Sequence, residues 1–362
     1  MTRLRYETWG AWVKTDAALV GLTRDGVRAL GLAESALWSD PAPPPSAPLE
    51  VHVAVTSRCA AGCEGCYLDA RPDGVEPPRD VIEARLDALA EAGVFTVAFG
   101  GGEPTLREDL GALADHARSR GLTPVVTTSG LGLGRRKIAA LTRFAQVNVS
   151  YDGAGDDYAS VRGFDGAAQA ESAIRELTSA GVLVGVNVVL TRATFPRLRA
   201  TLERARASGA REAQLLRYKP AGRARSLDYL ARRLSREQVD ELPRTLRDLS
   251  AALPDLRLRI DCALVPFLSS DPAFDAAALE RWGVFGCEAG AALSAQRVDG
   301  ALLPCSFGAP EDLEPFRAYP AAPAEPCATC TLRAVCRGGC KVVTRYLDGH
   351  VGPDPECPRV RA

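Results

Sequence analysis

Strand-like and helix-like patterns alternate along the central part of the chain. Short β-branched or apolar runs predict strands at residues 51–55, 94–99, 124–128, 146–151, 182–190 and 212–218. Helical periodicity follows at residues 78–93, 106–118, 136–144 and 167–180, and in a segment that ends at Ala207. About six such units of roughly 30 residues indicate the α/β class with a parallel sheet. Because six units are fewer than eight, we expect an open, partial (β/α)6 barrel with catalytic groups at the carboxyl ends of its strands.

The chain divides into four predicted parts. These are an N-terminal cap and linker at residues 1–48, the barrel at 49–234, a bridging region at 235–261 and a cysteine-rich domain at 262–362. In the cap, residues 12–22 predict a hairpin, 26–32 a short helix and 41–48 a stiff proline-rich linker. We expect this cap to exclude solvent from the active site. The bridging region predicts a helix at 236–253 and a strand at 256–260, whereas the last domain has little periodicity, so we expect its fold to depend on metal.

Composition narrows the class of protein. The 362 residues include 44 basic and 45 acidic side chains, and the net charge of -1 argues against a nucleic-acid-binding protein. The first ten residues lack the apolar core of a secretory signal, and the longest apolar stretch, residues 181–190, has about half the length of a membrane span. We therefore expect a cytoplasmic protein that binds no membrane. Its 11 cysteines form an odd total, which disfavours a disulfide scaffold and favours reduced or metal-bound thiols.

Three cysteines follow the first predicted barrel strand. Cys59, Cys63 and Cys66 have the spacing C-x3-C-x2-C, which lets three thiolates hold three corners of an iron–sulfur cluster. Such a cluster takes four ligands, so one iron stays open. A zinc loop or incidental cysteines are the alternatives, but a zinc site would need a local histidine or a fourth cysteine. The closest histidine, His52, lies within the preceding strand.

A glycine-rich motif ends the second predicted strand. Gly101, Gly102, Glu103 and Pro104 combine a backbone that permits close approach with a carboxylate beside exposed amides. A lone motif of this kind is usually a turn before a helix. Here it stands on the strand end next to the three cysteines, and the two features together resemble the radical S-adenosylmethionine (SAM) enzymes.

The resemblance covers roughly residues 51–223 and implies specific roles. The three cysteines match the family's cluster motif, Tyr67 is in the place of its aromatic neighbour, and residues 101–104 match its methionine-binding GGEP motif. In such enzymes one iron chelates the amino and carboxylate groups of SAM, so Glu103 and nearby backbone would hold the ammonium. Weaker matches to the family's sequence pattern on later strands imply that the SAM ribose or carboxylate contacts Ser150, Asn187 and Arg217. Each of these three is equally well explained as an ordinary polar residue at a strand end.

Seven cysteines near the C-terminus resemble the SPASM extension of radical SAM enzymes. They follow the pattern C-x12-G-x4-C, a gap, C-x2-C-x5-C-x3-C, a gap and a final C, whereas an isolated C-x2-C pair would by default bind zinc. The resemblance implies two auxiliary [4Fe–4S] clusters, which makes three clusters in all. The family's interleaved ligation assigns the distal cluster to Cys327, Cys330, Cys336 and Cys357, and the proximal cluster to Cys287, Cys305 and Cys340.

Cys262 is left over from both motifs. A lone thiol is most often a buried structural residue, and a thiol that donates a hydrogen atom to a radical is a second interpretation. Some SPASM enzymes complete the proximal cluster with a cysteine upstream of the motif, and Cys262 is the candidate for that role here. We favour the ligand role, which would make all 11 cysteines cluster ligands.

The resemblance implies a reaction class. A reduced cluster would cleave SAM to a 5′-deoxyadenosyl radical, which abstracts a hydrogen atom from the substrate, and auxiliary clusters suggest a net oxidation. SPASM enzymes mostly modify peptides, so we expect a maturase that oxidatively modifies, and most simply crosslinks, a ribosomally made precursor peptide. The cap is too short for a leader-binding domain, so a separate recognition protein is a further expected partner, together with a flavodoxin- or ferredoxin-type electron donor.

Other functions remain open at this point. One is a small-molecule dehydrogenase or haem-pathway-like enzyme, and a zinc-binding adaptor is a less favoured reading. Sulfatase-type maturation is also less favoured, because those enzymes carry an acidic base directly after the second SPASM cysteine, whereas Ser306 follows Cys305 here. The catalytic base is unknown, since the sequence gives no paired partner for His52, His116 or His350.

Overall fold

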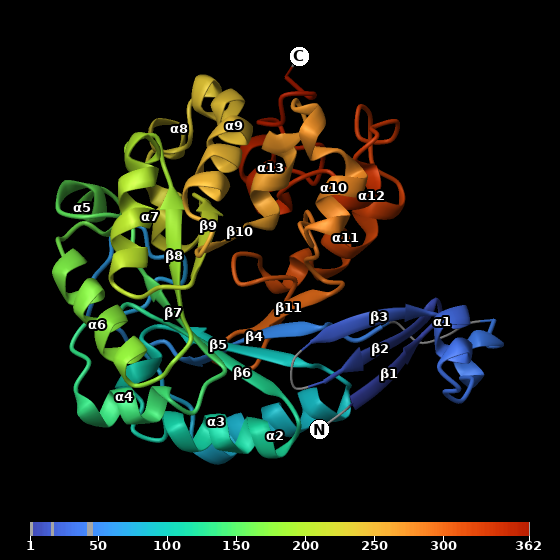
Figure 1. Cartoon of the computed structure of the whole chain (residues 1–362), viewed down its shortest axis with the longest axis horizontal. Helices are drawn as coiled ribbons and strands as arrows, with labels where there is room; N and C mark the ends of the chain where they lie inside the picture. The colour runs from blue at the N-terminus through green and yellow to red at the C-terminus, as the bar shows by residue number, and fades with distance from the viewer. Residues whose placement is uncertain (1–2, 16–17, 42–45, 362) are drawn as a thin grey trace.

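The core of the protein is a nine-stranded sheet. The computed structural model describes residues 3–15, 18–41 and 46–361. Six adjacent parallel strands confirm the predicted barrel: β4 (Glu50–Thr56), β5 (Thr96–Gly101), β6 (Thr123–Thr128), β7 (Gln146–Ser150), β8 (Val184–Leu190) and β9 (Glu212–Arg217). Figure 1 shows this sheet curving round, with helices on its outside and the C-terminal region to one side.

The sheet extends beyond the six predicted strands at both edges. Strand β10 (Arg257–Ile260), expected in the bridging region, pairs in parallel with β9. At the other edge β11 (Leu293–Gln296) pairs in parallel with β4, and the two-residue β12 (Leu302–Leu303) pairs with β11. The last two lie in the cysteine-rich region and are too short to produce a periodic pattern. Strand β11 pairs with the hydrogen-bonding groups of β4, which an exposed edge would leave unpaired.

Helices cover the outer face of the sheet. They are α2 (Arg79–Glu91), α3 (Leu110–Ser119), α4 (Arg135–Leu141), α5 (Asp156–Arg162), α6 (Ala167–Ser179), α7 (Leu198–Ala207), α8 (Tyr229–Arg232) and α9 (Arg236–Ala252), with 3-10 turns at Pro104–Leu106, Phe195–Arg197 and Gly222–Ser226. Helix α2 buries the predicted face of Ile82, Leu86 and Leu89. Helix α9 starts at a capping box between Ser235 and Gln238. The pattern did not predict α5, which is only seven residues long.

Alternation along β4 separates the two faces of the barrel wall. Val51, Val53 and Val55 are at most 1% exposed and belong to the main apolar core with the outer helices. Because successive side chains of a strand point to opposite faces, Glu50, His52 and Ala54 face the barrel interior. The same alternation puts polar side chains of the neighbouring strands inside the barrel.

The N-terminal cap is a three-stranded antiparallel sheet. It consists of β1 (Arg3–Glu7), which was not predicted, β2 (Gly10–Lys14) and β3 (Leu19–Thr23), followed by α1 (Arg24–Ala29) and a 3-10 turn at Ala36–Trp38. The predicted hairpin is confirmed in its strands. Residues 16–17 of its turn and 42–45 of the expected linker lie outside the described residues.

The position of the cap differs from the expected one. Arg3 donates hydrogen bonds to the carbonyls of Val94 and Gly121, and Arg5 donates to that of Gly93. These carbonyls precede β5 and β6, at the amino ends of the strands. The cap therefore lies at the end of the barrel opposite to the carboxyl ends, and this position does not support the expected role in excluding solvent from the site.

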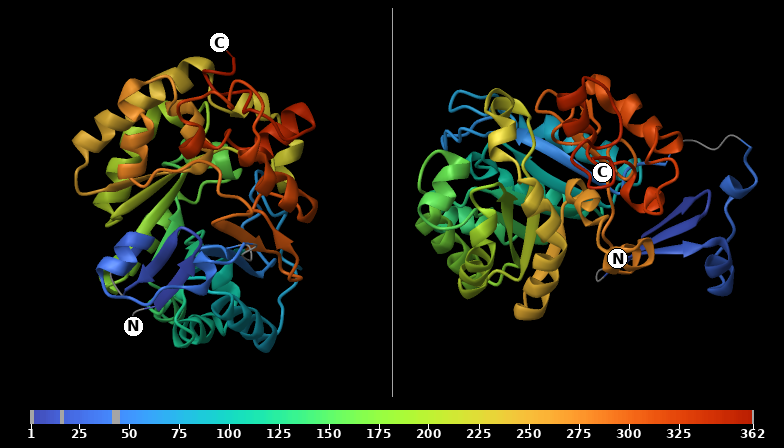
Figure 2. Two further views of the ribbon diagram at one scale, coloured as in Figure 1. Left: turned by 90° about the vertical axis from the view of Figure 1, so that its right-hand side faces the viewer. Right: turned by 90° about the horizontal axis from the view of Figure 1, so that it is seen from above.

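The C-terminal region consists of short helices joined by loops. They are α10 (Ala276–Arg281), α11 (Leu313–Ala318), α12 (Arg333–Cys336) and α13 (Lys341–Asp348), with 3-10 segments at Cys262–Leu268, Pro272–Phe274, Pro310–Asp312 and Tyr319–Ala321. Figure 2 shows this region, in orange and red, packed beside the barrel, and the N-terminal sheet projecting away from it. Within the described residues, no helix is both long and apolar enough to cross a membrane.

Candidate functional site

The loop that holds Cys59, Cys63 and Cys66 leaves the carboxyl end of β4 and is fixed by hydrogen bonds. The Arg223 guanidinium donates to the Cys63 carbonyl at 2.9 and 3.2 Å, and the Arg223 amide donates to the Cys66 carbonyl at 2.8 Å. Burial raises the pKa of the Cys59 thiol, and Glu103, Cys63 and Cys66 raise it further through their charge. The three predicted ligands thus lie together, as thiols that a metal must deprotonate.

The predicted glycines allow the next strand end to approach this loop. The Gly102 amide donates to the Thr56 carbonyl at 2.7 Å, and the Glu103 amide donates to the Arg58 carbonyl at 2.8 Å. A Cβ on Gly101 would lie 2.1 Å from the Thr56 oxygen, and one on Gly102 2.1 Å from the Arg58 oxygen. Only glycine fits this backbone-to-backbone contact, so the GGEP segment and the cysteine loop form one continuous surface.

Glu103 links the ends of β5 and β6. Its carboxylate is buried and accepts hydrogen bonds from the hydroxyls of Thr105, Thr128 and Ser129 at 2.8, 2.7 and 2.6 Å. The backbone amides of Thr105 and Ser129 add two more, at 3.2 and 2.8 Å. These five donors hold the carboxylate and the loop around it in place. The contact of Glu103 with the SAM ammonium stays a prediction.

Ser150 and Asn187 face each other across β7 and β8. They are register partners: Ser150 is the last residue of β7, and Asn187 lies in the middle of β8. The Asn187 Oδ1 atom is buried and accepts no hydrogen bond from the described residues. An unpaired buried acceptor is costly, so this carboxamide suits a bound ligand with hydroxyl donors, such as a ribose. On the cysteine side, the half-buried Tyr67 has its ring centroid 4.7 Å from that of Phe307, and desolvation raises the pKa of Tyr67 to about 12.

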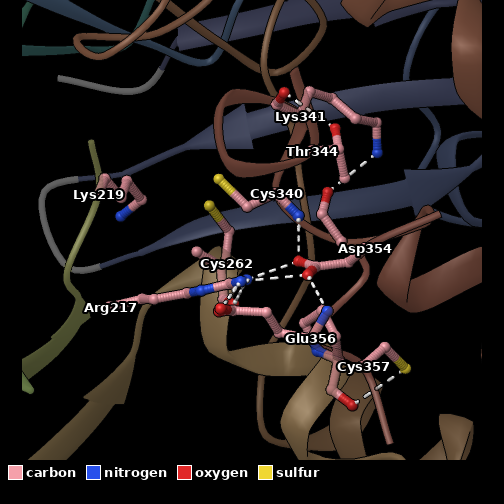
Figure 3. Close-up of polar contacts among 12 residues, drawn as sticks. Arg217, Lys219, Cys262, Cys340, Lys341, Thr344, Asp354, Glu356 and Cys357 are labelled. Carbon is pink, nitrogen blue, oxygen red and sulfur yellow. Dashed lines mark hydrogen bonds and ion pairs between the residues drawn. The ribbon is translucent and has the colours of Figure 1, made fainter. Parts of the chain in front are cut away.

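Arg217 binds the C-terminal region of the chain. Its guanidinium is buried and binds Asp354 at 2.5 and 3.1 Å, Glu356 at 2.5 Å and the Ala263 carbonyl at 3.1 Å (Figure 3). These acceptors bind both terminal nitrogens, while the buried Nε atom has no partner among the described residues. The contact of Arg217 with SAM stays a prediction. The residue joins the carboxyl end of β9 to the C-terminal region, a role that the sequence does not reveal because its carboxylate partners are more than 130 residues away.

Four cysteines gather beside the carboxyl end of β9, and we call them the proximal set. They are Cys262, Cys287, Cys305 and Cys340. Burial raises the pKa of Cys262 well above its ordinary value, and Asp261, Cys287 and Cys340 raise it further through their charge. Burial likewise raises the pKa of Cys305 to about 12, with Cys287 and Cys340 adding to it. The sulfur atoms of Cys262 and Cys340 lie side by side in Figure 3. The left-over cysteine of the sequence thus joins the other three.

The other four C-terminal cysteines line one cavity, and we call them the distal set. They are Cys327, Cys330, Cys336 and Cys357, and the other residues that line the cavity include Pro266, Leu332 and Val360. Burial raises the pKa of Cys336 to about 12, and the charge of Cys357 raises it further. Within the described residues, no three His, Cys, Asp or Glu side chains converge as ligands of a single metal ion.

One contact inside the barrel was missed by sequence reasoning. The His52 Nδ1 atom lies 2.6 Å from the Ser306 hydroxyl, and His52 Nε2 lies 2.8 Å from a Glu50 carboxylate oxygen. Ser306 is 254 residues from His52, so no local pattern could pair them. The alternation of β4 was the available signal, because it places a histidine and a glutamate on the inner face.

Comparison with known proteins agrees with this geometry. Residues 53–205 match the radical SAM superfamily. The chain is 28% identical to the PqqA peptide cyclase of Rhodopseudomonas palustris over 86% of both chains. It is 27% identical to the mycofactocin maturase MftC of Mycolicibacterium smegmatis, over 86% of this chain and 83% of that one. The crystal structure of Streptococcus suis SuiB bound to its precursor peptide SuiA matches with a TM-score of 0.76 and 15% identity, over 99% of this chain and 98% of SuiB.

The family match and the geometry meet at the same residues. The matched range includes the cysteine loop and the GGEP segment, and the likeness to SuiB shows a common fold. A radical SAM domain binds a [4Fe–4S] cluster and SAM, which fits three thiols on one loop beside a glycine-lined strand end. The chain therefore contains a radical SAM domain, over residues 53–205.

Proposed function

We propose that this enzyme is a maturase that oxidatively modifies, by a crosslink, a ribosomally made precursor peptide. The observation that carries the proposal is the gathering of eight thiols into two sets of four beside the barrel. The relatives that match over most of the chain bear the names of peptide-modifying enzymes, PqqA peptide cyclase and mycofactocin maturase, and SuiB was solved with a precursor peptide.

We assign the first cluster to Cys59, Cys63 and Cys66. With SAM bound and one electron added, this cluster supplies a carbon radical that removes a hydrogen atom from the substrate. The chain's own residues would orient SAM: Gly101 and Gly102 let the end of β5 pack against the cysteine loop, where the methionine part would bind, and Asn187 offers a free acceptor to its ribose. Glu103 keeps the loop rigid through its five donors.

We assign one auxiliary [4Fe–4S] cluster to the proximal set and one to the distal set, which makes three clusters in all. Cys262 is then the fourth ligand of the proximal cluster, supported by its position beside Cys287 and Cys340. Lys219 stands at the same place, paired with Asp261, and its charge lowers the pKa of the Cys305 and Cys340 thiols. A cation beside four thiolates favours their charged form.

The substrate and partners follow from this arrangement. A peptide would enter at the carboxyl ends of the strands, between the cysteine loop and the proximal set. A flavodoxin or ferredoxin would supply the electron in the cytoplasm, and a separate protein would present the leader segment. A small-molecule substrate is the alternative outcome of the test below.

The test is turnover of a candidate peptide. The peptide encoded by a short reading frame beside the gene is incubated anaerobically with reconstituted enzyme, SAM and dithionite, and its mass is measured together with 5′-deoxyadenosine. The proposal expects the peptide to lose two hydrogen atoms for each crosslink, and the enzyme with Cys59, Cys63 and Cys66 changed to alanine to give neither product. Reductive SAM cleavage that leaves every such peptide unchanged would favour the small-molecule alternative.

A further inference from the structure

The structure assigns a proton-accepting role to three residues inside the barrel, Glu50, His52 and Ser306, which we call the relay. In this inference, the Ser306 hydroxyl takes a proton from the substrate while passing its own to His52, and Glu50 stabilises the charge that forms on the imidazole. The inference rests on the proposed function, because it names the group that completes the oxidation.

Two hydrogen bonds define the relay and its direction. A carboxylate accepts only, so His52 Nε2–H donates to Glu50 at 2.8 Å. In the neutral imidazole the other nitrogen is then an acceptor, and the Ser306 hydroxyl donates to Nδ1 at 2.6 Å. A carboxylate that orients a histidine, which in turn accepts from a hydroxyl, is the arrangement by which proteins make a neutral imidazole a general base.

The relay faces the barrel interior and not the packed core. Val51 and Val53 on the opposite face of β4 are buried against the outer helices. The side chains of Glu50 and His52 are each 37% exposed, so the imidazole can exchange protons with solvent or a bound molecule. Of the two strands paired with β4, neither carries an ionisable side chain: β5 reads TVAFGG and β11 reads LSAQ.

Few charges compete with this histidine. Glu50 is its carboxylate partner, and the pKa of Glu50 is lowered: burial raises it, but His52 and Arg259 of β10 outweigh burial. Arg259 also pairs with Glu212, the first residue of β9, and this pair holds the Arg259 cation at the amino end of the barrel strands. The imidazole therefore has one fixed carboxylate on one side and one hydroxyl on the other.

Ser306 lies next to a cysteine of the proximal set, which indicates the step of the reaction in which the relay would act. It follows Cys305 of the proximal set directly, so the proton acceptor and the thiolate that would hold the proximal cluster come from adjacent residues. Forming a crosslink from a substrate radical and an X–H group makes one C–X bond, breaks the X–H bond, and releases one electron and one proton. The proximal set would hold the cluster that accepts the electron, and His52 takes the proton through Ser306, which balances the step.

The first test needs no substrate. The chain has three histidines, so 15N-imidazole NMR of the reconstituted enzyme with SAM resolves each of them. His52 is expected as the tautomer protonated at Nε2, because that nitrogen donates to Glu50 and Nδ1 accepts from Ser306. Glu50→Gln is expected to raise the population of the Nδ1-protonated tautomer, because the anionic acceptor at Nε2 is lost. A wild-type His52 protonated at Nδ1, or the same tautomer populations in Glu50→Gln, would overturn the relay.

The second test uses turnover of the same encoded peptide. In His52→Gln we expect modified peptide per 5′-deoxyadenosine to fall by about 100-fold or more, the size of a lost general base. A protonated imidazole cannot accept a proton, so wild-type product should also fall towards low pH, and this acid limb should be absent from the variant. Ser306→Asp in the His52→Gln background should restore part of the yield, because a carboxylate at 306 can accept the proton itself.

A matched control separates this role from folding. His116 also binds a carboxylate, Asp87, at 2.7 Å, but between α2 and α3 on the outside of the barrel. His116→Gln should leave product, 5′-deoxyadenosine and the pH profile unchanged. The inference would be contradicted if His52→Gln lost modified peptide and 5′-deoxyadenosine equally. It would also be contradicted if this variant gave the full yield of modified peptide with the wild-type pH profile. If wild-type enzyme modifies no encoded peptide, the proposed function fails and the NMR test alone decides the relay.

Discussion

The barrel and the C-terminal region are built on different physical principles. In the barrel, regular strands and helices bury continuous apolar faces, as in β4 and α2. From Cys262 onward the longest helix, α13, has only eight residues, and the buried positions include cysteines and charged groups such as Lys341 and Asp354. Apolar burial stabilises the first region whether or not metal is bound. The second, as we propose, depends on its clusters.

The largest expected effect comes from removing the metal. Without clusters, each thiol set becomes buried polar surface with no ligand, and structural metal sites contribute on the order of 10 kcal/mol to folding. We expect hydrogen exchange of the apo protein to show residues 262–361 exposed and the strands β4 to β9 still protected. Equal protection of both regions in the apo protein would remove the contrast between them.

The next effect concerns the ion pairs that join the two regions. Arg217→Met leaves the buried Asp354 without its cation (Figure 3) and Glu356 with Arg233 alone, and an unpaired buried charge typically costs about 3–5 kcal/mol. Denaturant unfolding of the reconstituted enzyme measures this change. Arg199→Met is the control, since its pair with Glu203 is exposed and should contribute at most about 1 kcal/mol. Similar losses in both variants would show that the junction is not special.

A third prediction concerns acid. The Arg247 guanidinium donates to Asp271 and, with the Ala273 amide, holds the pKa of this carboxyl below its usual range. Because the pKa of Asp271 is depressed in the folded protein, its ion pair with Arg247 stabilises the fold at a pH above the pKa of the unfolded chain, about 3.9. This stabilisation is lost as the pH falls through the pKa of the folded protein. The contact between α9 and the start of the C-terminal region should therefore weaken below about pH 4. Asp271→Asn should flatten that pH dependence, measured by unfolding midpoints from pH 3 to 7.

The smallest effect belongs to a single SAM contact. Asn187→Ala removes one hydrogen bond to the ribose, worth about 0.5–1.5 kcal/mol, so the Kd for SAM should rise about 2- to 10-fold in equilibrium dialysis. Asn148→Ala on the neighbouring strand is the control, because its carboxamide already accepts from Gln146. An unchanged Kd in the first variant would remove Asn187 from the site.

Sequence patterns predicted the barrel well for a physical reason. Each strand and helix there has a periodic apolar face, so local residues such as Ile82, Leu86 and Leu89 reveal it. The two C-terminal thiol sets were expected from the resemblance to the SPASM pattern, because cysteines such as Cys262 and Cys287 lie too far apart along the chain for a local pattern to pair them. The strands β1, β11 and β12 escaped prediction, since short edge strands owe their pairing to distant partners.

Long-range polar contacts were the main gap. Arg217 was expected at SAM because strand ends carry ligand contacts, and its contact with Asp354 and Glu356, in a loop near the other end of the chain, was not foreseen. His52 had no visible partner for the same reason, although Glu50 stood two residues away. A pattern read along one segment reports which face a side chain takes, whereas its hydrogen-bond partner depends on the folded topology.

Counting the clusters tests the central claim most directly. Iron and sulfide are measured in anaerobically purified, reconstituted enzyme, with Mössbauer and EPR spectroscopy to identify the cluster type. Three four-iron clusters predict about twelve irons per chain, and about eight when Cys59, Cys63 and Cys66 are all changed to alanine. Two results would contradict the three-cluster assignment. One is about four irons per chain that are lost entirely in that variant, and the other is zinc in the proximal and distal sets.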